Sequence, residues 1–290
     1  MSYTGFLLFR FIVWMFSFIS FNVLYKVADF TEWLLYSVFK YRKNIVLHQL
    51  RASFPQKPEE EILKIARASY TNLADIILES IKGFTMSESE FRKRYIFTNP
   101  EVSISIRQDV VSTIQIGAHY GNWEWGAISY PLWFPAPVLG FYKPLSNPYI
   151  EEYGRKKRGR FSMLLISIGD TSKAFSQYGN SGATYVFASD QSTWSDKAHW
   201  VTFLGQDTAC PPGADKYASQ LKCPVFFTDI QRVKRGYYEV TQIMLTDGEE
   251  QLTEGEITKR YMKKLEEIII KKPENWLWSH KRWKKKRELT

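Results

Sequence analysis

Residues 110–125 read VVSTIQIGAHYGNWEW, and this stretch indicates the fold class. Its first half is a largely apolar run, rich in β-branched residues, that ends at Gly117 and is typical of a buried strand. Gly121 and Asn122 then supply a turn signal before a second apolar stretch. A buried strand followed directly by a turn and a helix favours an α/β protein.

The same alternation continues along the rest of the chain. Further strand-like runs cover residues 137–143, 163–168, 183–189, 224–230 and 237–245. Helix-start signals lie between them, at Asn147-Pro148, at Asp170, at Pro212 and at a capping box from Thr253 to Glu256. We therefore predict an α/β core over residues 101–290, in which helices flank a mixed sheet.

Residues 29–100 predict a helical segment in front of this core. Pro58 and the acidic run 59–61 mark the start of a helix. Its apolar residues, from Ile62 to Ile77, recur at helical spacing. We assign this stripe to the hydrophobic core rather than to a site.

Residues 1–28 predict a membrane anchor helix. Residues 5–25 carry Arg10 as their only charge, and a helix of about 21 residues is long enough to cross the roughly 30 Å apolar layer of a bilayer. Trp14 and the many phenylalanines also permit a helix that lies flat at the surface. Because positive charges follow the apolar stretch, we expect residues 29–290 on the cytoplasmic side, with residues 30–39 resting on the membrane.

The charge balance is positive and local. Lys and Arg outnumber Asp and Glu by 39 to 30, and basic residues crowd the stretch 281–287. Such a run binds nucleic acid, anionic lipid or an acidic protein, or is simply a solvated tail. The two cysteines, Cys210 and Cys223, have neither zinc-ligand spacing nor the pattern of a disulfide framework.

The residues best suited to chemistry are His119 and Glu124. On a continuous helix residues at this spacing point about 140° apart, so the two side chains can meet only if the chain turns at Gly121 and Asn122. Glu124 would then orient the imidazole while His119 removes a proton from an attacking hydroxyl, which describes a general base held by a carboxylate.

Signatures of other common enzyme classes are missing from the chain. There is no G-x-S-x-G elbow, no Walker loop, no G-x-G-x-x-G and no H-E-x-x-H, which argues against serine hydrolases, nucleotide-binding proteins and zinc proteases. A metal cluster of His119, Asp190 and His199 remains an alternative. We predict no bound metal and no cofactor.

Four motifs occur together in a characteristic order. They are H-x-G-N-W-E at 119–124, G-x-Y-[KR]-P-x-x-N-P at 140–148, Asp190-Gln191, and W-x-H-[KR]-R-[WF]-K at 278–284. With these motifs and the stretch YRKNIVLHQLRASFP at 41–55, the chain resembles the bacterial lipid A late acyltransferase family, within the wider glycerolipid acyltransferase group. The resemblance covers nearly the whole chain.

The resemblance implies roles for the residues around the first motif. His119 would be the base and Glu124 its partner. The tetrahedral oxyanion would be stabilised by backbone groups near Gly121 and Asn122 or by a basic side chain. Asp190 would shape the site or hold an arginine.

The family also requires an arginine after the Asn-Pro helix start. Arg158 is the best match, with Arg155 and Arg160 as rivals, and the functional interpretation is recognition of a phosphate on the acceptor. Residues 203–205 and 211–213 read FLG and PPG, where the family usually has Phe-Phe-Gly and Thr-Pro-x-Gly.

The expected activity is acyl transfer from a thioester to a hydroxyl of a membrane lipid. The resemblance implies acyl carrier protein as the donor, with coenzyme A as an alternative co-substrate, a lipid A precursor as the acceptor and the inner membrane as the location. Other acceptors, namely a lysophospholipid, a glycolipid or an aminolipid, stay open. A non-catalytic, membrane-tethered binding protein is the alternative from another class, although we predict no nucleic acid partner.

Overall fold

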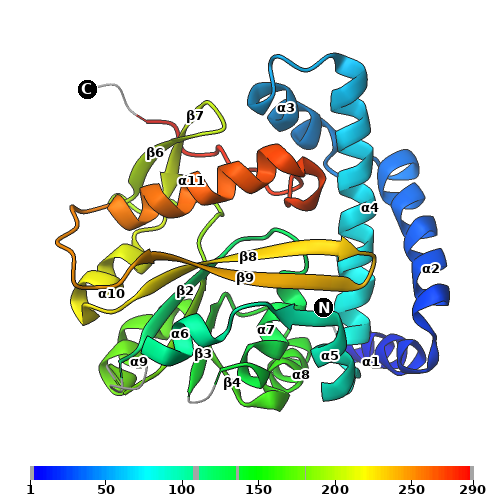
Figure 1. Cartoon of the computed structure of the whole chain (residues 1–290). Coiled ribbons are helices and arrows are strands. Elements are labelled where there is room, and N and C mark those ends of the chain that lie inside the picture. Colours follow the sequence, from blue (N-terminus) through cyan, green and yellow to red (C-terminus); the bar gives the residue numbers. More distant parts are fainter. Residues whose placement is uncertain (1–2, 107–110, 135–136, 180, 288–290) are drawn as a thin grey trace.

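The computed structural model describes residues 3–106, 111–134, 137–179 and 181–287. Within these residues a seven-stranded sheet has the order β1-β9-β8-β2-β5-β3-β4 (Figure 1). The strands are β1 (Tyr95–Phe97), β2 (Thr113–Gly117), β3 (Val138–Tyr142), β4 (Met163–Ser167), β5 (Thr184–Ala188), β8 (Val225–Lys234) and β9 (Tyr237–Thr246). Neighbouring strands are parallel except for the antiparallel pair β8–β9, so the sheet is mixed, as predicted.

All the predicted strands are present, although the predicted start of β2 at Val110 lies outside the described residues. Three strands were missed, namely β1, β6 and β7. The short edge strand β1 comes from the segment predicted to be helical. The hairpin β6 (His199–Phe203) and β7 (Gln206–Cys210) turns at Leu204 and Gly205, both at positive φ, as a tight two-residue hairpin turn requires.

Eleven α-helices surround the sheet in the described residues. They are α1 (Tyr3–Phe18), α2 (Phe21–Trp33), α3 (Lys43–Ser53), α4 (Glu59–Gly83), α5 (Glu88–Arg94), α6 (Glu101–Ile106), α7 (Trp123–Ser129), α8 (Pro148–Arg158), α9 (Thr171–Tyr178), α10 (Gly213–Leu221) and α11 (Glu256–Lys271). A π-helical turn, η1 (Leu34–Val38), continues α2, and a 3-10 turn, η6 (Pro273–Asn275), follows α11. The predicted starts at Pro58, Asn147 and Pro212 are confirmed.

Two hydrophobic clusters pack against the sheet. The larger joins strand residues such as Ile116 and Phe227 to α10 and α11, with Leu265 fully buried. The second joins Val138 and Val240 to α5 and α7 through Phe91 and Trp125. The long helix α4 stands beside the sheet and separates it from α2 (Figure 1).

One predicted helix start is wrong. Thr253 and Glu256 form no capping box, because α11 begins at Glu256 after Gly255, which lies at positive φ. The first amides of α11 instead donate to the carboxylate of Asp215 in α10: Ile257 N–H at 3.1 Å and Thr258 N–H at 3.0 Å. A side chain distant in sequence therefore supplies the cap.

The apolar stretch 5–25 is not one helix. It breaks after Phe18, and α2 begins at Phe21, with Ser20 Oγ accepting from Val23 N–H. On the other side of the break, Lys82 Nζ of α4 donates to the carbonyls of residues 16, 17 and 19 at 2.8–2.9 Å. These bonds satisfy the carbonyls that a helix end leaves unpaired, so the break is stabilised from both sides.

None of the helices in the described part of the chain combines the length and apolar character that a membrane span needs.

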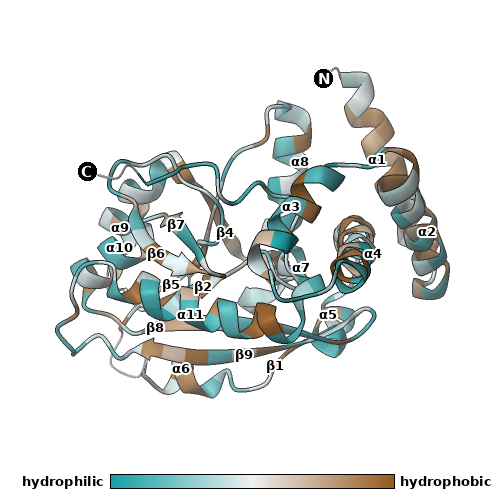
Figure 2. Cartoon of the chain, turned by 90° about the horizontal axis from the view of Figure 1, so that it is seen from above, coloured by the Kyte–Doolittle hydropathy of each residue, from teal (hydrophilic) through white to brown (hydrophobic). Residues whose placement is uncertain are grey.

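The consecutive helices α1 and α2 present an apolar face to the outside. Six side chains of α1 are between 45% and 73% exposed: Leu7, Leu8, Phe11, Trp14, Met15 and Phe18. At 100° per residue they fall within an arc of about 120°. Val23, Val27, Phe30 and Trp33 of α2 are exposed as well. Figure 2 shows both helices on the outer side of α4.

The basic C-terminal stretch is not simply a solvated tail. Arg282 is 1% exposed and donates to the carbonyl of Ala209 at 2.8 Å, while Trp283 packs against the larger hydrophobic cluster. Lys281, Lys284, Lys286 and Arg287 remain exposed. The segment therefore belongs to the folded core and leaves some of its charge at the surface.

Candidate active site

His119 and Asp190 meet at the carboxyl edge of the sheet. β2 and β5 are parallel neighbours, and Gly117 at the end of β2 pairs with Ala188 at the end of β5. His119 and Asp190 each follow two residues later, so both side chains emerge at the same edge. His119 Nδ1 lies 2.7 Å from Asp190 Oδ1, and its backbone N–H donates to Oδ2 at 3.1 Å.

The C-terminal segment completes the environment of Asp190. Trp276 Nε1–H donates to Asp190 Oδ2 at 2.9 Å, and residues 275–277 run antiparallel along residues 119–121. The carbonyl of His119 accepts from Leu277 N–H at 3.0 Å. Asp190 is only 2% exposed, so three donors satisfy a carboxylate that water barely reaches.

The second ring nitrogen of His119 is placed to act as a base. Because Asp190 accepts a hydrogen bond from Nδ1–H, the neutral imidazole carries its proton there and keeps Nε2 as its acceptor nitrogen. Gln191 Nε2 lies 3.1 Å from that nitrogen, and the side chain of His119 is 19% exposed. This arrangement is the orienting-carboxylate geometry of acyl-transfer enzymes.

Electrostatics favour the charged imidazolium. Burial lowers the pKa of His119, but the charge and hydrogen bond of Asp190, with a smaller contribution from Glu124, outweigh it and hold the pKa above its ordinary value. For Asp190, burial raises the pKa, but the contacts with His119 and Trp276 dominate and leave it below the usual value. The pair therefore stabilises a proton received at Nε2.

A second histidine lies near the pair. His280 Nε2 accepts from the backbone and hydroxyl of Ser192, both at 3.2 Å. Burial, reinforced by the charge of Lys284, lowers the pKa of His280 to about 4. His280 is therefore neutral at physiological pH and anchors the C-terminal segment to the loop after Asp190.

Glu124 does not hold the imidazole in this structure. It lies on the first turn of α7 and accepts two hydrogen bonds from Arg158, at 2.7 Å from Nη2 and 3.1 Å from Nε. The carboxylate that contacts the His119 ring is Asp190. The expected partnership thus takes a different form: Asp190 contacts the imidazole, and Glu124 pairs with Arg158 nearby.

The three candidate arginines have different surroundings. Arg158 reaches Glu124. Arg155 pairs with the exposed Glu152 on its own helix. Arg160 donates to the carbonyls of Gly83 and Phe84 at the end of α4. Of the three, Arg158 alone contacts a residue of the predicted site.

Gly121 and Asn122 shape the turn between the strand and α7. Gly121 has φ +61°, and a Cβ there would lie 2.8 Å from Ile230, so only glycine fits. Its N–H donates to the carbonyl of Asn275 at 3.0 Å, so this amide is engaged rather than free for an oxyanion. Asn122 is buried, and its Oδ1 caps α7 by accepting from Trp125 N–H at 2.9 Å.

An apolar groove of about 320 Å³ opens beside Glu124 and Arg158. Its walls are apolar side chains of α1, α4, α7 and α8 and of the connection before α8: Phe9, Leu73, Ile76, Ile77, Ile81, Phe84, Trp123, Leu145 and Ile150. Part of the α4 stripe that we assigned to the core therefore lines a cavity. Trp123 also contacts the His119 ring, with 5.1 Å between the ring centroids, so it links groove and base.

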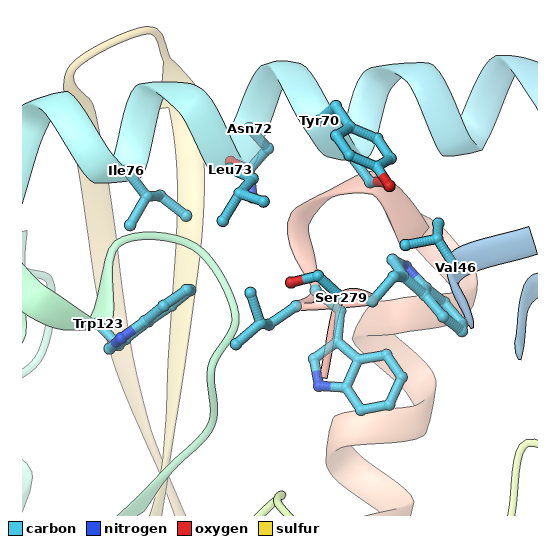
Figure 3. A pocket seen from close by; sticks show the side chains of 11 residues that line it. Val46, Tyr70, Asn72, Leu73, Ile76, Trp123 and Ser279 are labelled. Atoms are coloured by element: carbon cyan, nitrogen blue, oxygen red, sulfur yellow. The ribbon is translucent and has the colours of Figure 1, made fainter. Parts of the chain in front are cut away.

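A much smaller cavity lies on the other side of Trp123. It encloses about 10 Å³, room for about one water molecule. Figure 3 shows Leu73 and Ile76 projecting from α4 toward Trp123 and Ser279, which lie below the helix in this view. The C-terminal segment therefore packs close to α4 beside the base.

Several residues of this site were not predicted from the sequence. One residue of the predicted alternative, a metal cluster, lies elsewhere. His199 is in the β6–β7 hairpin, beside Gly255. Trp276, Gln191 and Ser192 were not assigned roles, although Gln191 follows Asp190 in a quoted motif. The signal that could have paired His119 with Asp190 is positional, because each lies just beyond a predicted buried strand.

Comparisons with known proteins match the chain to one family. A family model described as Bacterial lipid A biosynthesis acyltransferase matches residues 1–285. The chain is 22% identical over 247 residues to a lipid A biosynthesis palmitoleoyltransferase of Escherichia coli K12, which covers 84% of this chain and 79% of the relative. A lipid A biosynthesis acyltransferase of Shigella flexneri gives the same values.

A further relative extends the match. A lipid A biosynthesis lauroyltransferase of Escherichia coli K12 is 20% identical over 284 residues, covering 96% of this chain and 90% of the relative. Since the family model spans almost the whole chain, including the elements that carry His119, Asp190 and Trp276, this protein is an acyltransferase and belongs to the bacterial lipid A biosynthesis acyltransferase family.

Proposed function

We propose that this protein transfers a fatty-acyl group from the thioester of an acyl carrier protein to a hydroxyl of a lipid A precursor. Family membership supports the reaction and the class of acceptor. The observation that carries the mechanism is the contact of His119 Nδ1 with Asp190, which leaves Nε2 as a base.

The reaction proceeds by direct attack. His119 Nε2 takes the proton of the acceptor hydroxyl as its oxygen bonds to the thioester carbonyl carbon. Asp190 stabilises the imidazolium that forms. The tetrahedral intermediate then collapses, the C–S bond breaks, and the imidazolium returns its proton to the departing thiolate. No acyl-enzyme is needed.

Glu124 and Arg158 serve the substrates rather than the imidazole. Glu124 holds the guanidinium of Arg158 at the wall of the apolar groove. There Arg158 is a cation for the oxyanion or for a phosphate of the acceptor, while the groove receives an acyl chain. Arg155 and Arg160, occupied by Glu152 and by the end of α4, take no part.

The donor approaches from the basic side of the molecule. The exposed residues Lys281, Lys284 and Lys286 follow the segment that touches Asp190, and their charge suits an acidic carrier protein. Competition between acyl carrier protein and coenzyme A thioesters tests this choice, and equal kcat/KM for the two donors would contradict it.

The protein acts at the cytoplasmic face of the inner membrane. We propose that the exposed face of α1–α2 inserts into the membrane interface with both helices lying flat, which keeps the enzyme in the plane of its acceptor. Leu8→Glu with Phe11→Glu should abolish flotation with anionic vesicles. Ile270→Glu, at an exposed site on α11, is the control. Flotation that survives the double substitution would contradict the insertion.

The decisive experiment removes the base. In His119→Ala, transfer from a labelled thioester to a lipid A precursor should fall about 10³-fold, because a positioned general base supplies rate enhancements of that order. His48→Ala, at an exposed site on α3, should keep wild-type activity. If folded wild type binds the lipid without transferring acyl groups, the non-catalytic alternative is correct; transfer to lysophospholipid, glycolipid or aminolipid instead would identify another acceptor.

A further inference from the structure

A buried carboxylate outside the catalytic pair reaches the helix that carries Glu124. Glu79 of α4 is 0% exposed, and three side-chain donors converge on it. Asn122 Nδ2–H donates to Oε2 at 2.6 Å, Tyr238 O–H to Oε2 at 2.7 Å, and Tyr25 O–H to Oε1 at 2.8 Å. These donors come from the α7 cap, from β9 and from α2.

The bond to Asn122 has a fixed direction. Asn122 Oδ1 is used to cap α7 at Trp125 N–H, so its amide nitrogen must face Glu79 and needs an acceptor there. A second bond reinforces the first, since Trp125 Nε1–H donates to the Glu79 carbonyl at 2.8 Å. The first turn of α7 is thus tied to one residue of α4 at two points.

Close packing leaves α7 little freedom to move. A Cβ on Gly83, one turn after Glu79, would lie 2.9 Å from the Trp125 indole nitrogen. A Cβ on Gly126 would lie 2.8 Å from the hydroxyl of Tyr95. The two glycines let α7 pack directly against α4 and against β1, and Glu79 supplies polar contacts between α7 and α4.

We propose that Glu79 is a positioning residue for the acyl transfer, which holds Asn122 and thereby the turn of α7 that presents Trp123 and Glu124 to the groove. The inference rests on the proposed function for its kinetic consequence. Its structural consequence, the order of α7, is independent of any activity. The proposal extends to α2, because Tyr25 of this helix donates a hydrogen bond to the same carboxylate. The N-terminal part of the chain therefore also supports the active site.

Three substitutions of Glu79 separate the effect of its side-chain length from the effect of its charge. Glu79→Met removes the acceptor, and kcat should fall about 10²-fold with the KM for the thioester within twofold, because a misplaced group of this kind loses transition-state contacts. Glu79→Asp keeps the charge but withdraws it by one methylene group, so kcat should fall about tenfold by the same argument. Glu79→Gln should stay within about threefold, since its oxygen can accept from Asn122 and Tyr238 while its NH2 donates to Tyr25.

The matched control is Asp215→Leu. Asp215 is another buried, hydrogen-bonded carboxylate, but it caps α11 rather than α7. Amide hydrogen exchange in peptides covering residues 119–129 should rise in Glu79→Met and Glu79→Asp and stay at the wild-type rate in Glu79→Gln and Asp215→Leu. Each variant is measured as the full chain in lipid nanodiscs.

The outcomes are distinct. Wild-type exchange and kcat in Glu79→Asp would overturn the proposal, as would a Glu79→Gln variant as impaired as Glu79→Met, since charge and not the acceptor would then be at work. If Glu79→Met does not fold, the contrast of Asp with Gln decides. If wild type transfers no acyl group, the proposed function fails, while the exchange pattern still tests the positioning role.

Discussion

The connection from β2 to α7 and the break between α1 and α2 are held in place by different means. In the first, the turn is made by adjacent residues: Gly121 supplies the positive φ, and Asn122 caps the helix that follows. In the second, Ser20 makes a local cap of 3.4 Å, while three shorter bonds come from Lys82, more than sixty positions away.

The difference shows how far local sequence can determine a change in chain direction. A turn that needs a special backbone conformation is visible in the sequence, because only particular residues adopt it. A break in an apolar helix needs partners for its end carbonyls, and these can come from any part of the fold. Four predictions test this difference, beginning with the largest expected effect.

The largest effect is expected at the edge of the sheet. Asp190→Asn should lower kcat about 10²-fold, because the base loses its orienting charge. The Asp190 carboxylate raises the pKa of His119 against the effect of burial, and only the neutral ring can accept a proton. The acidic limb of the pH–rate profile should therefore lie above the ordinary histidine pKa in wild type and move to lower pH in the variant.

Thermal unfolding checks that Asp190→Asn is folded. The same pH–rate profile measured on His48→Ala is the control. An acidic limb that stays in place in Asp190→Asn would show that another carboxylate, Glu124 first of all, sets the pKa of the base.

The second effect concerns the ion pair beside the groove. Glu124→Gln should lower kcat/KM about tenfold, since Arg158 loses the partner that orients it, and an active-site group that is misplaced costs rate. Glu152→Gln, which breaks the exposed pair with Arg155, should leave the kinetics at the wild-type level. Equal losses in the two variants would remove Arg158 from the site.

The third effect concerns the hydrogen bonds of Lys82 at the break between α1 and α2. Lys82→Met should destabilise the protein by about 2 kcal/mol, because hydrogen bonds from a charged donor are lost at the end of α1. Calorimetry should show a fall in Tm of several degrees, and hydrogen exchange should rise over residues 16–24. Lys64→Met, exposed on the same helix, is the matched control. Unchanged exchange at residues 16–24 would mean that the break does not depend on Lys82.

The smallest effect is local. Ser20→Ala should cost about 0.5 to 1 kcal/mol, the lower range for an N-cap, because its bond is long. Chemical denaturation measures it, with Ser17→Ala, at a half-buried site on α1, as reference. If Ser20→Ala lowers the free energy of unfolding more than Lys82→Met does, the break between α1 and α2 is held mainly by its local sequence, contrary to the difference described above.

The sheet strands were predictable because each is a short apolar run bounded by turn residues, as at 183–189 and 224–230. For the carboxylate beside His119, the sequence and the structure point to different residues. Sequence proximity favoured Glu124, five positions away, whereas parallel pairing of β2 with β5 brings Asp190 to the ring across 71 positions. Trp276 is likewise brought to Asp190 only by the fold.

By itself the sequence determined the α/β class and the turn at Gly121 and Asn122, and it pointed to His119 as the proposed base, because apolar periodicity and backbone conformation are properties of neighbouring residues. The tertiary structure decided which carboxylate holds the imidazole, where the N-terminal apolar stretch breaks and how far the C-terminal segment is buried. These choices depend on strand register and on hydrogen bonds between distant side chains, which local sequence does not encode.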